Sequence, residues 1–158
     1  MLSTNTPADL FCQIAAGDHE AAIVTRTPEL VAFLDHRPVF KGHVLIAPVS
    51  HVDTLLDLPQ TLMAPLLTLG QRMARAIGVA LAAEGTFVAM NNVVSQSVPH
   101  LHLHVVPRSR GDGLRGFFWP RTRYGEGEMA AYAQLISEAL SSQPGFHQPG
   151  HPPPAESP

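Results

Sequence analysis

The chain has 158 residues, of which 45% are hydrophobic and 15% charged, and its formal net charge is −3 at neutral pH. These values predict one globular domain with a sizeable core; they exclude a disordered chain and give no reason to expect a nucleic-acid partner. The single cysteine, Cys12, excludes an internal disulfide.

The N-terminal residues lack the basic and apolar regions of a signal peptide. No apolar run reaches the roughly 18 residues of a membrane span. We therefore expect a cytoplasmic protein that contacts no membrane.

Three short apolar runs in the first half predict β-strands. They cover residues 21–25, 30–34 and 43–47, after a lead-in of residues 1–9. Turn-forming residues such as Pro28 separate them, as is typical of short strands.

The longest periodic segment runs from about Pro59 to Ala83 and predicts an amphipathic helix with one apolar stripe. Pro65 lies inside this segment. Because proline costs about 3 kcal/mol in a helix interior, we expect either a kink or a helix that begins later.

The second half adds a strand over residues 86–90 and a helix over residues 128–141. From Gln143 onward six of sixteen residues are proline, which predicts a disordered tail over 143–158. The elements together predict an α+β domain over residues 10–142.

Three histidines alternate with apolar residues directly after Pro99, as His100, His102 and His104. This period of two predicts a β-strand in which the imidazoles share one face and Leu101, Leu103 and Val105 share the other. Burying three imidazoles is costly without partners. We therefore expect the histidine face to handle a polar ligand.

The segment from Ser95 to Arg108 resembles the signature of the histidine triad (HIT) family, in which such a strand follows a Gln-containing loop. Further family landmarks occur in the same order upstream, and the resemblance covers about residues 10 to 124. These landmarks are Phe11–Ile14, Gly17–Asp18, Phe33–Asp35, Gly42–Pro48 and His51. The resemblance implies an antiparallel sheet of about five strands, with one long helix and a C-terminal helix, in a protein that forms a homodimer.

The family implies that the middle histidine, His102, attacks the α-phosphorus of a nucleotide and forms a covalent nucleotidyl-histidine that water then hydrolyses. An imidazole with a pKa near 6.5 is mostly neutral, and therefore nucleophilic, at pH 7. His100 and His104 would contact phosphate oxygens or carry the leaving-group proton. Read alone, the three rings could also be simply exposed on an edge strand.

The resemblance also implies binding residues. Gln96 and Ser97 would contact the phosphate and Asp35 the ribose, while His36 would touch the base or ribose. Phe11, Ile14 and Phe33 match the wall of the base pocket, although each could be ordinary core, and Asn91 is favoured over Asn92 as a further contact. In the arginine-rich segment 108–123, Arg115, Trp119 and Arg121 could bind a leaving group or second nucleotide, or the aromatic residues could pack in a dimer.

Alternating histidines can also chelate a metal. Some HIT proteins hold zinc through a Cys-x-x-Cys pair and histidines, but here the residue paired with Cys12 is Asp9. We therefore expect no metal and no other cofactor, with Cys12 as a small buried residue, and we expect His43 and His51 to be structural.

These residues predict a hydrolase that releases AMP from an adenine nucleotide conjugate. A histidine at position 104 favours hydrolysis, because relatives with glutamine there are mainly transferases or phosphorylases. Two substrate classes stay open, nucleoside phosphoramidates and dinucleoside polyphosphates, and the basic segment slightly favours the second. The alternatives are a nucleotide-binding module with vestigial catalysis and a metal-dependent phosphohydrolase.

Overall fold

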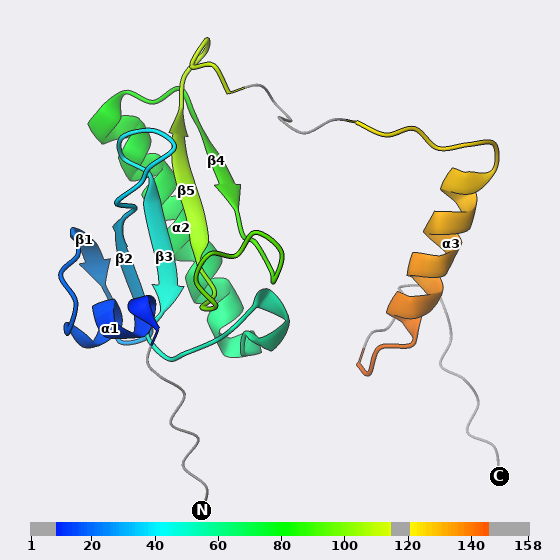
Figure 1. Cartoon of the computed structure of the whole chain (residues 1–158), viewed down its shortest axis with the longest axis horizontal. Coiled ribbons are helices and arrows are strands. Elements are labelled where there is room, and N and C mark those ends of the chain that lie inside the picture. Colours follow the sequence, from blue (N-terminus) through cyan, green and yellow to red (C-terminus); the bar gives the residue numbers. More distant parts are fainter. Residues whose placement is uncertain (1–8, 115–120, 146–158) are drawn as a thin grey trace, which may run out of the picture. The chain divides into compact units, whose positions relative to one another are not determined.

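A computed structural model describes residues 9–114 and 121–145 of the chain. The chain divides into two compact units, residues 1–113 and 114–158 (Figure 1). The five strands and helices α1 and α2 lie in the first unit, and helix α3 lies in the second.

The first unit is built on a five-stranded sheet in the order β1-β2-β3-β5-β4. Every neighbouring pair is antiparallel. The strands are β1 (Ile23–Arg26), β2 (Leu30–Leu34), β3 (Val44–Pro48), β4 (Gly85–Ala89) and β5 (Leu103–Arg108). This confirms the predicted α+β class and the five-stranded antiparallel sheet.

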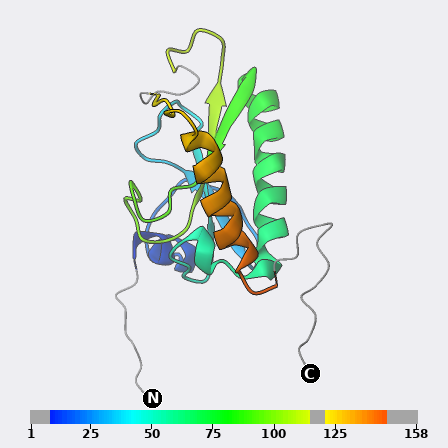
Figure 2. The same cartoon turned by 90° about the vertical axis from the view of Figure 1, so that its right-hand side faces the viewer.

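Helix α2 (Gln60–Leu81) covers one face of the sheet (Figure 2). Its stripe of Leu66, Met73 and Ile77 is buried in the larger hydrophobic core. The helix begins at Gln60 and runs through Pro65, so a later start is not what the chain adopts. Burying side chains of this size contributes about 1.5–3 kcal/mol each, which offsets the loss of about 3 kcal/mol at the proline.

Helix α1 (Leu10–Ala16) lies on the other face and buries Phe11 and Ile14 in a second cluster with Phe33 and Leu45. Neither this helix nor the 3-10 turn η1 (Leu55–Asp57) was predicted. Seven residues are too few for a periodic pattern to identify α1. Its start is fixed by the Asp9 carboxylate, which accepts hydrogen bonds from the first-turn backbone N–H groups.

The histidine segment follows the predicted alternation. Leu101, Leu103 and Val105 are buried in the core beneath α2. His104 pairs across the ladder with Leu45 of the second cluster, and the rings of His100 and His102 both contact Phe11. The three imidazoles therefore face the α1 side of the sheet.

The ladder of β5 begins at Leu103, later than the predicted start at His100. The facing strand β3 ends at Pro48, which has no N–H to donate to a ladder. The Pro48 carbonyl accepts instead from Nε2 of the His100 ring, at 2.9 Å. Side-chain bonding thus replaces strand pairing at this end.

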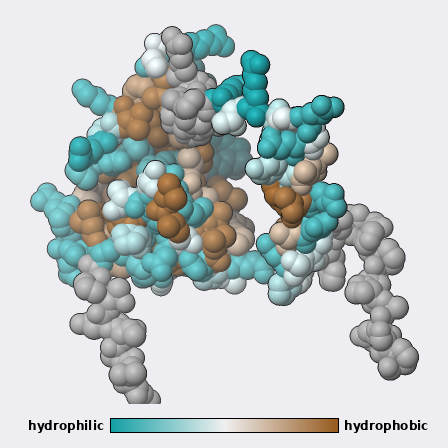
Figure 3. Space-filling model, turned by 45° about the vertical axis from the view of Figure 1, so that its right-hand side comes forward, coloured by the Kyte–Doolittle hydropathy of each residue, from teal (hydrophilic) through white to brown (hydrophobic). Residues whose placement is uncertain are grey.

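Helix α3 (Glu128–Ser141) confirms the second predicted helix. Its apolar side chains, including Met129, Leu135 and Ile136, are exposed, and hydrophobic groups appear on this helix in Figure 3.

No described helix is long and apolar enough to cross a membrane. The predicted domain limits stay predictions, as does the tail, whose residues 146–158 lie outside the described part of the chain, like residues 1–8.

Candidate functional site

A pocket of about 700 Å³ lies on the α1 side of the sheet. Ligand pockets for small molecules span roughly 300–1,000 Å³, so its size suits a nucleotide. Eight of the predicted site residues line it: Phe11, Ile14, Phe33, Asp35, His36, Ser97, His102 and His104.

One wall of the pocket is apolar and well packed. Phe11 meets Phe33 edge to face, with the ring centroids 5.2 Å apart, and meets the His102 ring at 5.0 Å and 89°. Ile14 is buried beside them. Such a wall can pack against a flat aromatic base.

His102 is held in one tautomer. Its Nδ1 lies 2.7 Å from the His100 carbonyl oxygen, which can only accept, so Nδ1 carries the hydrogen and donates it. Burial lowers the pKa of His102, although the bond to the His100 carbonyl opposes this. The ring is therefore neutral at pH 7 and its second nitrogen, Nε2, keeps a lone pair.

His104 has the opposite tautomer, because of a chain of hydrogen bonds that starts at Val39. The Val39 N–H donates to Nδ1 of His43 at 3.3 Å, so the His43 hydrogen is on Nε2. That Nε2–H donates to Nδ1 of His104 at 2.9 Å. His104 therefore carries its hydrogen on Nε2, which is buried and has no hydrogen-bond partner among the described residues.

The pKa values agree with neutral rings along this chain. Burial lowers the pKa of His43, against the opposing charge of Asp35. Burial, with the His102 and His43 rings, lowers the pKa of His104 to about 4. At pH 7 the site thus pairs a lone-pair nitrogen on His102 with an N–H donor on His104, and their ring centroids are 4.7 Å apart.

Asp35 and His36 also line the pocket, and their predicted contact with the ribose stays a prediction. The Asp35 carboxylate accepts from the backbone N–H of Arg37 at 2.8 Å through Oδ1. Its Oδ2 lies 3.5 Å from Nδ1 of His43. The His36 side chain is 80% exposed, which places it on the pocket rim.

Of the predicted residues in the histidine segment and the loop before it, three are not among the lining residues. His100 is fully buried, and Gln96 and Asn91 hold the loop before the histidines. Gln96 donates from Nε2 to the Asp53 carbonyl at 2.6 Å and accepts from the Val93 N–H at 2.8 Å. Asn91 donates from Nδ2 to the Ser95 carbonyl at 3.1 Å.

The same loop holds two non-glycine residues, Val93 (φ 65°) and Ser95 (φ 61°), in the left-handed region. This conformation is a genuine outlier for a β-branched side chain. Strain of this kind is often found at ligand sites.

The structure adds His19 and Glu20 to the pocket lining, which the sequence did not indicate. Gly17 ends α1 with φ 87°, a left-handed cap that turns the chain back. The Gly17–Asp18 landmark was the available signal for such a turn.

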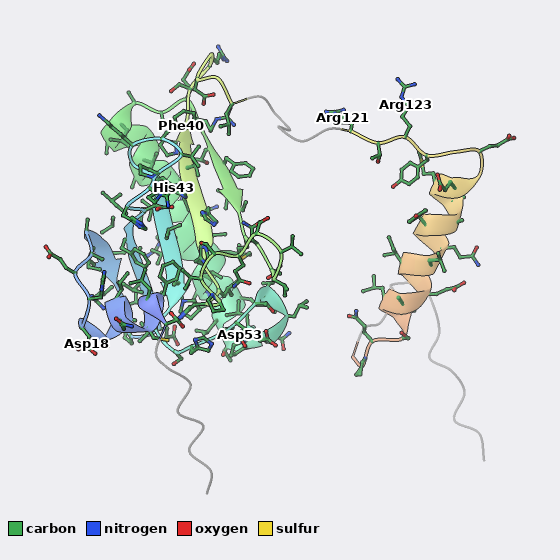
Figure 4. All side chains as sticks on the ribbon, viewed as in Figure 1. Asp18, Phe40, His43, Asp53, Arg121 and Arg123 are labelled. Carbon is green, nitrogen blue, oxygen red and sulfur yellow. The ribbon has the colours of Figure 1, made fainter. Side chains whose placement is uncertain are left out.

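The arginine-rich segment is only partly described. Arg108 is paired with Asp112 through two bonds of 2.6 and 3.0 Å, and Arg110 lies 3.8 Å from Glu84. Arg121 is exposed in the second unit (labelled in Figure 4), while Arg115 and Trp119 lie outside the described residues.

The described residues bring together two groups with the side chains that metals prefer. One is Asp35, His43 and His104, within the pocket region. The other is Asp9, Cys12, His51 and His100, whose ligand atoms lie within 4.8 Å of one another. Burial and the Asp9 carboxylate raise the pKa of the Cys12 thiol to about 11.

Known proteins share this sequence pattern and fold. A family model described as HIT domain matches residues 16–111. The chain is 31% identical over 133 residues to the adenosine 5'-monophosphoramidase hnt1 of Schizosaccharomyces pombe, which covers 83% of this chain and 97% of that protein.

Solved structures are similar as well. A HIT family member from Bacillus subtilis is 32% identical, with a TM-score of 0.75, over 85% of this chain and 99% of that one. A zinc-bound histidine triad family protein from Mycobacterium smegmatis is 38% identical, with a TM-score of 0.64, over 81% of this chain and 95% of that one.

Proposed function

The chain belongs to the histidine triad (HIT) family, and we propose that it is a hydrolase that releases AMP from an adenine nucleotide conjugate. The observation that carries this proposal is the fixed tautomer of His102, which aims a neutral nitrogen lone pair from the wall of a nucleotide-sized pocket.

The first step is nucleophilic. Nε2 of His102 attacks the α-phosphorus and a P–N bond forms, while the bond from phosphorus to the leaving group breaks. The leaving group takes the electron pair and a proton from the Nε2–H of His104. A covalent intermediate divides one difficult displacement into two easier ones. In the second step water attacks the phosphorus and gives a proton to Nε2 of His104, the P–N bond breaks, AMP leaves, and both histidines are restored.

Two donors would stabilise the charge on the phosphate. The Nε2–H of His104 has no hydrogen-bond partner among the described residues, and Ser97 lines the same pocket. Donors aimed at charge that develops in the transition state are worth factors of about 10² to 10³ in rate. Gln96 and Asn91 would act by shaping the loop, and His100 by offering its carbonyl to His102.

The adenosine is expected to lie along the apolar wall, with its base against Phe11, Ile14 and Phe33. Asp35 would then accept hydrogen bonds from the ribose hydroxyls, because its Oδ2 keeps lone pairs in addition to the 3.5 Å contact with His43. His36 on the rim would touch the outer edge of the base or sugar.

We favour a phosphoramidate as the substrate class. The relative in S. pombe is named an adenosine 5'-monophosphoramidase. Basic residues after the histidine strand would favour a polyphosphate, but one of them, Arg108, is already paired with Asp112. A dinucleoside polyphosphate is the alternative substrate class, and the experiment must distinguish it from a phosphoramidate.

The test is a competition between the two substrates. Adenosine phosphoramidate and diadenosine tetraphosphate are mixed with the protein and the products are separated by HPLC, with His102→Asn alongside. We expect AMP from the phosphoramidate with wild type only, while His102→Asn still binds AMP by calorimetry. AMP from the polyphosphate alone would change the substrate class, and equal turnover by His102→Asn would overturn the mechanism.

Binding of AMP by wild type without any turnover would instead indicate a nucleotide-binding module.

We also propose that the protein is cytoplasmic and that it forms a homodimer, the second as the family resemblance implies. β4 is an edge strand of the sheet and could pair with a second copy. Analytical ultracentrifugation at micromolar concentration tests the dimer, since a monomer there would contradict it.

A further inference from the structure

The nucleotide pocket has a polar end, and we infer that Glu20 there is a specificity-determining residue that accepts a hydrogen bond from the exocyclic amine of a purine base. Glu20 and its neighbour His19 line the same pocket as His102 and His104. The inference deepens the proposed function and rests on it, because it takes the position of the α-phosphate from it.

The sheet places Glu20 at the end of the pocket that is far from the histidines. One line of paired residues crosses the sheet from His104 of β5 to Ile23 of β1, by way of β3 and β2. Neighbouring strands lie roughly 4.8 Å apart, so this line is about 14 Å long. Glu20 comes shortly before Ile23 in the chain. The pocket therefore extends from the histidines toward the β1 edge of the sheet.

The order of groups along the pocket matches the order of groups in a nucleotide. Asp35, the predicted ribose contact, directly follows β2, which lies between β1 and the histidine strand. The Leu34 N–H donates to the Ala22 carbonyl at 3.0 Å, which brings the chain after Glu20 alongside this strand end. With the phosphate at His102 and the ribose at Asp35, the base extends toward β1 and its outer edge faces Glu20.

The turn that carries Glu20 is held by hydrogen bonds on both sides. The Gln13 carbonyl accepts from two backbone N–H groups of the turn, at 2.9 and 3.3 Å, and the first of these belongs to Asp18 (labelled in Figure 4). The Arg26 guanidinium donates to two carbonyls of the last turn of α1, at 2.7 and 2.8 Å, and so joins this helix end to β1. Because the backbone is already ordered, binding a base there costs less conformational entropy.

The Glu20 carboxylate is available to a ligand. Its side chain is exposed and has no hydrogen bond to any other described residue. An ionised carboxylate only accepts hydrogen bonds, so its partner must be a donor. On a purine the exocyclic amine is such a donor, at N6 of adenine or N2 of guanine.

The apolar wall cannot choose between bases in this way. Phe11 and Phe33 pack against the face of a ring, and every base has such a face. A base-specific contact therefore has to come from the polar end of the pocket, where Glu20 lies.

The rival explanation is that Glu20 is a solvated charge at the mouth of the pocket that contacts no base. Such a charge would weaken the binding of every nucleotide to the same degree, through repulsion of the phosphate. An accepted hydrogen bond acts only on a base that carries an amine. Two nucleotides that differ in the amine alone separate the explanations, because their phosphates are identical.

The test compares two pairs of nucleotides by calorimetry with the full chain. AMP and purine riboside 5'-monophosphate differ only in the N6 amine, while GMP and IMP differ only in the N2 amine. The first pair tests adenine, the base of the proposed function, and the second tests guanine as the other source of the amine. We expect wild type to bind the amine-bearing member of one pair about three- to tenfold more tightly.

Three variants assign this preference to its residue. Glu20→Ala should bind both members of that pair equally, and Glu20→Gln, which keeps a neutral acceptor, should retain part of the preference. Glu29→Ala is the matched control, since Glu29 is an exposed acid that does not line the pocket, and it should keep the wild-type preference. Both residues are exposed, so these changes leave the core intact.

Equal affinity of wild type for the two members of both pairs would overturn the inference, as would a preference that survives in Glu20→Ala. Turnover is measured separately. If wild type cleaves adenosine phosphoramidate but shows no preference in either pair, the proposed function stands and the inference fails. If wild type shows the Glu20-dependent preference but cleaves neither substrate, the inference stands and the proposed hydrolase activity fails.

Discussion

His43 and His104 are joined by a hydrogen bond of 2.9 Å between Nε2 of the first and Nδ1 of the second. The bond connects the residue before β3 to the neighbouring strand β5. Because the Val39 N–H fixes the His43 tautomer, the bond also fixes which nitrogen of His104 carries a hydrogen. A buried residue outside the histidine repeat thereby determines that Nε2 of His104 is the donor nitrogen of that ring.

Replacing His43 should affect the chemical step. In His43→Leu, Nδ1 of His104 loses its donor and the ring can adopt the other tautomer, at the cost of a hydrogen bond worth about 1 kcal/mol. We expect kcat to fall roughly tenfold or less with KM nearly unchanged. His43→Gln, whose amide can donate, should recover part of the loss. If kcat is the same in both variants as in wild type, His43 does not position His104.

Acid should destabilise the fold through His104. Burial, with the His102 and His43 rings, lowers the pKa of His104 from 6.5 to about 4. Between those values the unfolded chain binds a proton here that the folded chain does not, so the free energy of unfolding falls as the pH is lowered. The contribution is fully present above pH 6.5 and is lost as pH falls toward about 4.

Urea unfolding at several pH values measures this effect, with EDTA present throughout so that metal release does not contribute. In His104→Gln the free energy of unfolding should fall less steeply between pH 6.5 and 4, because one buried histidine with a lowered pKa has been removed. The other buried histidines account for the decrease that remains. Parallel curves for wild type and variant would contradict the assignment.

The loop before the histidines should become more stable with glycine at position 93. Val93 adopts φ 65°, a left-handed conformation that costs an L-residue roughly 1–2 kcal/mol. Glycine adopts it freely, so Val93→Gly should raise the free energy of unfolding by up to about 1 kcal/mol after its greater unfolded-state entropy is subtracted.

The neighbouring residue is a matched control for this change. Val94 is similarly exposed, at 79% against 74% for Val93, and is not among the residues with positive φ. Val94→Gly should therefore lower stability by roughly 0.5–1 kcal/mol. Thermal melts of the two variants should move in opposite directions, and a loss in both would argue against strain at Val93.

Two glycines of α2 should respond differently to alanine. A Cβ at Gly70 would lie 2.7 Å from Cδ2 of Leu103, which is only 1% exposed and has little room to move. A Cβ at Gly78 would meet its nearest atom at 3.7 Å, an ordinary contact. Alanine at Gly78 should gain about 1 kcal/mol of helix propensity.

At Gly70 the same gain is opposed by overpacking, which costs roughly 1–3 kcal/mol. Gly70→Ala should thus be the less stable variant in chemical denaturation, by about the overpacking term. Equal stability of the two would mean that Leu103 adjusts its rotamer without cost.

The sequence predicted those parts of the fold that follow from local periodicity. The alternation around His102 predicted which face each side chain takes, and the apolar stripe of α2 predicted the helix through Leu66 and Ile77. Helix α1 was missed because its seven residues contain no repeat, and its local signals are only the caps at Asp9 and Gly17.

The sequence by itself determined the family, the strand faces and eight of the residues that line the pocket, because residue type and spacing along the chain encode them. Only the tertiary structure decided how the ring nitrogens of each histidine are bonded. The hydrogen on His104 depends on His43, and Nδ1 of His100 lies beside Asp9 and Cys12. Such roles are set by donors and acceptors that come from distant parts of the chain, and a pattern of neighbours cannot specify their directions.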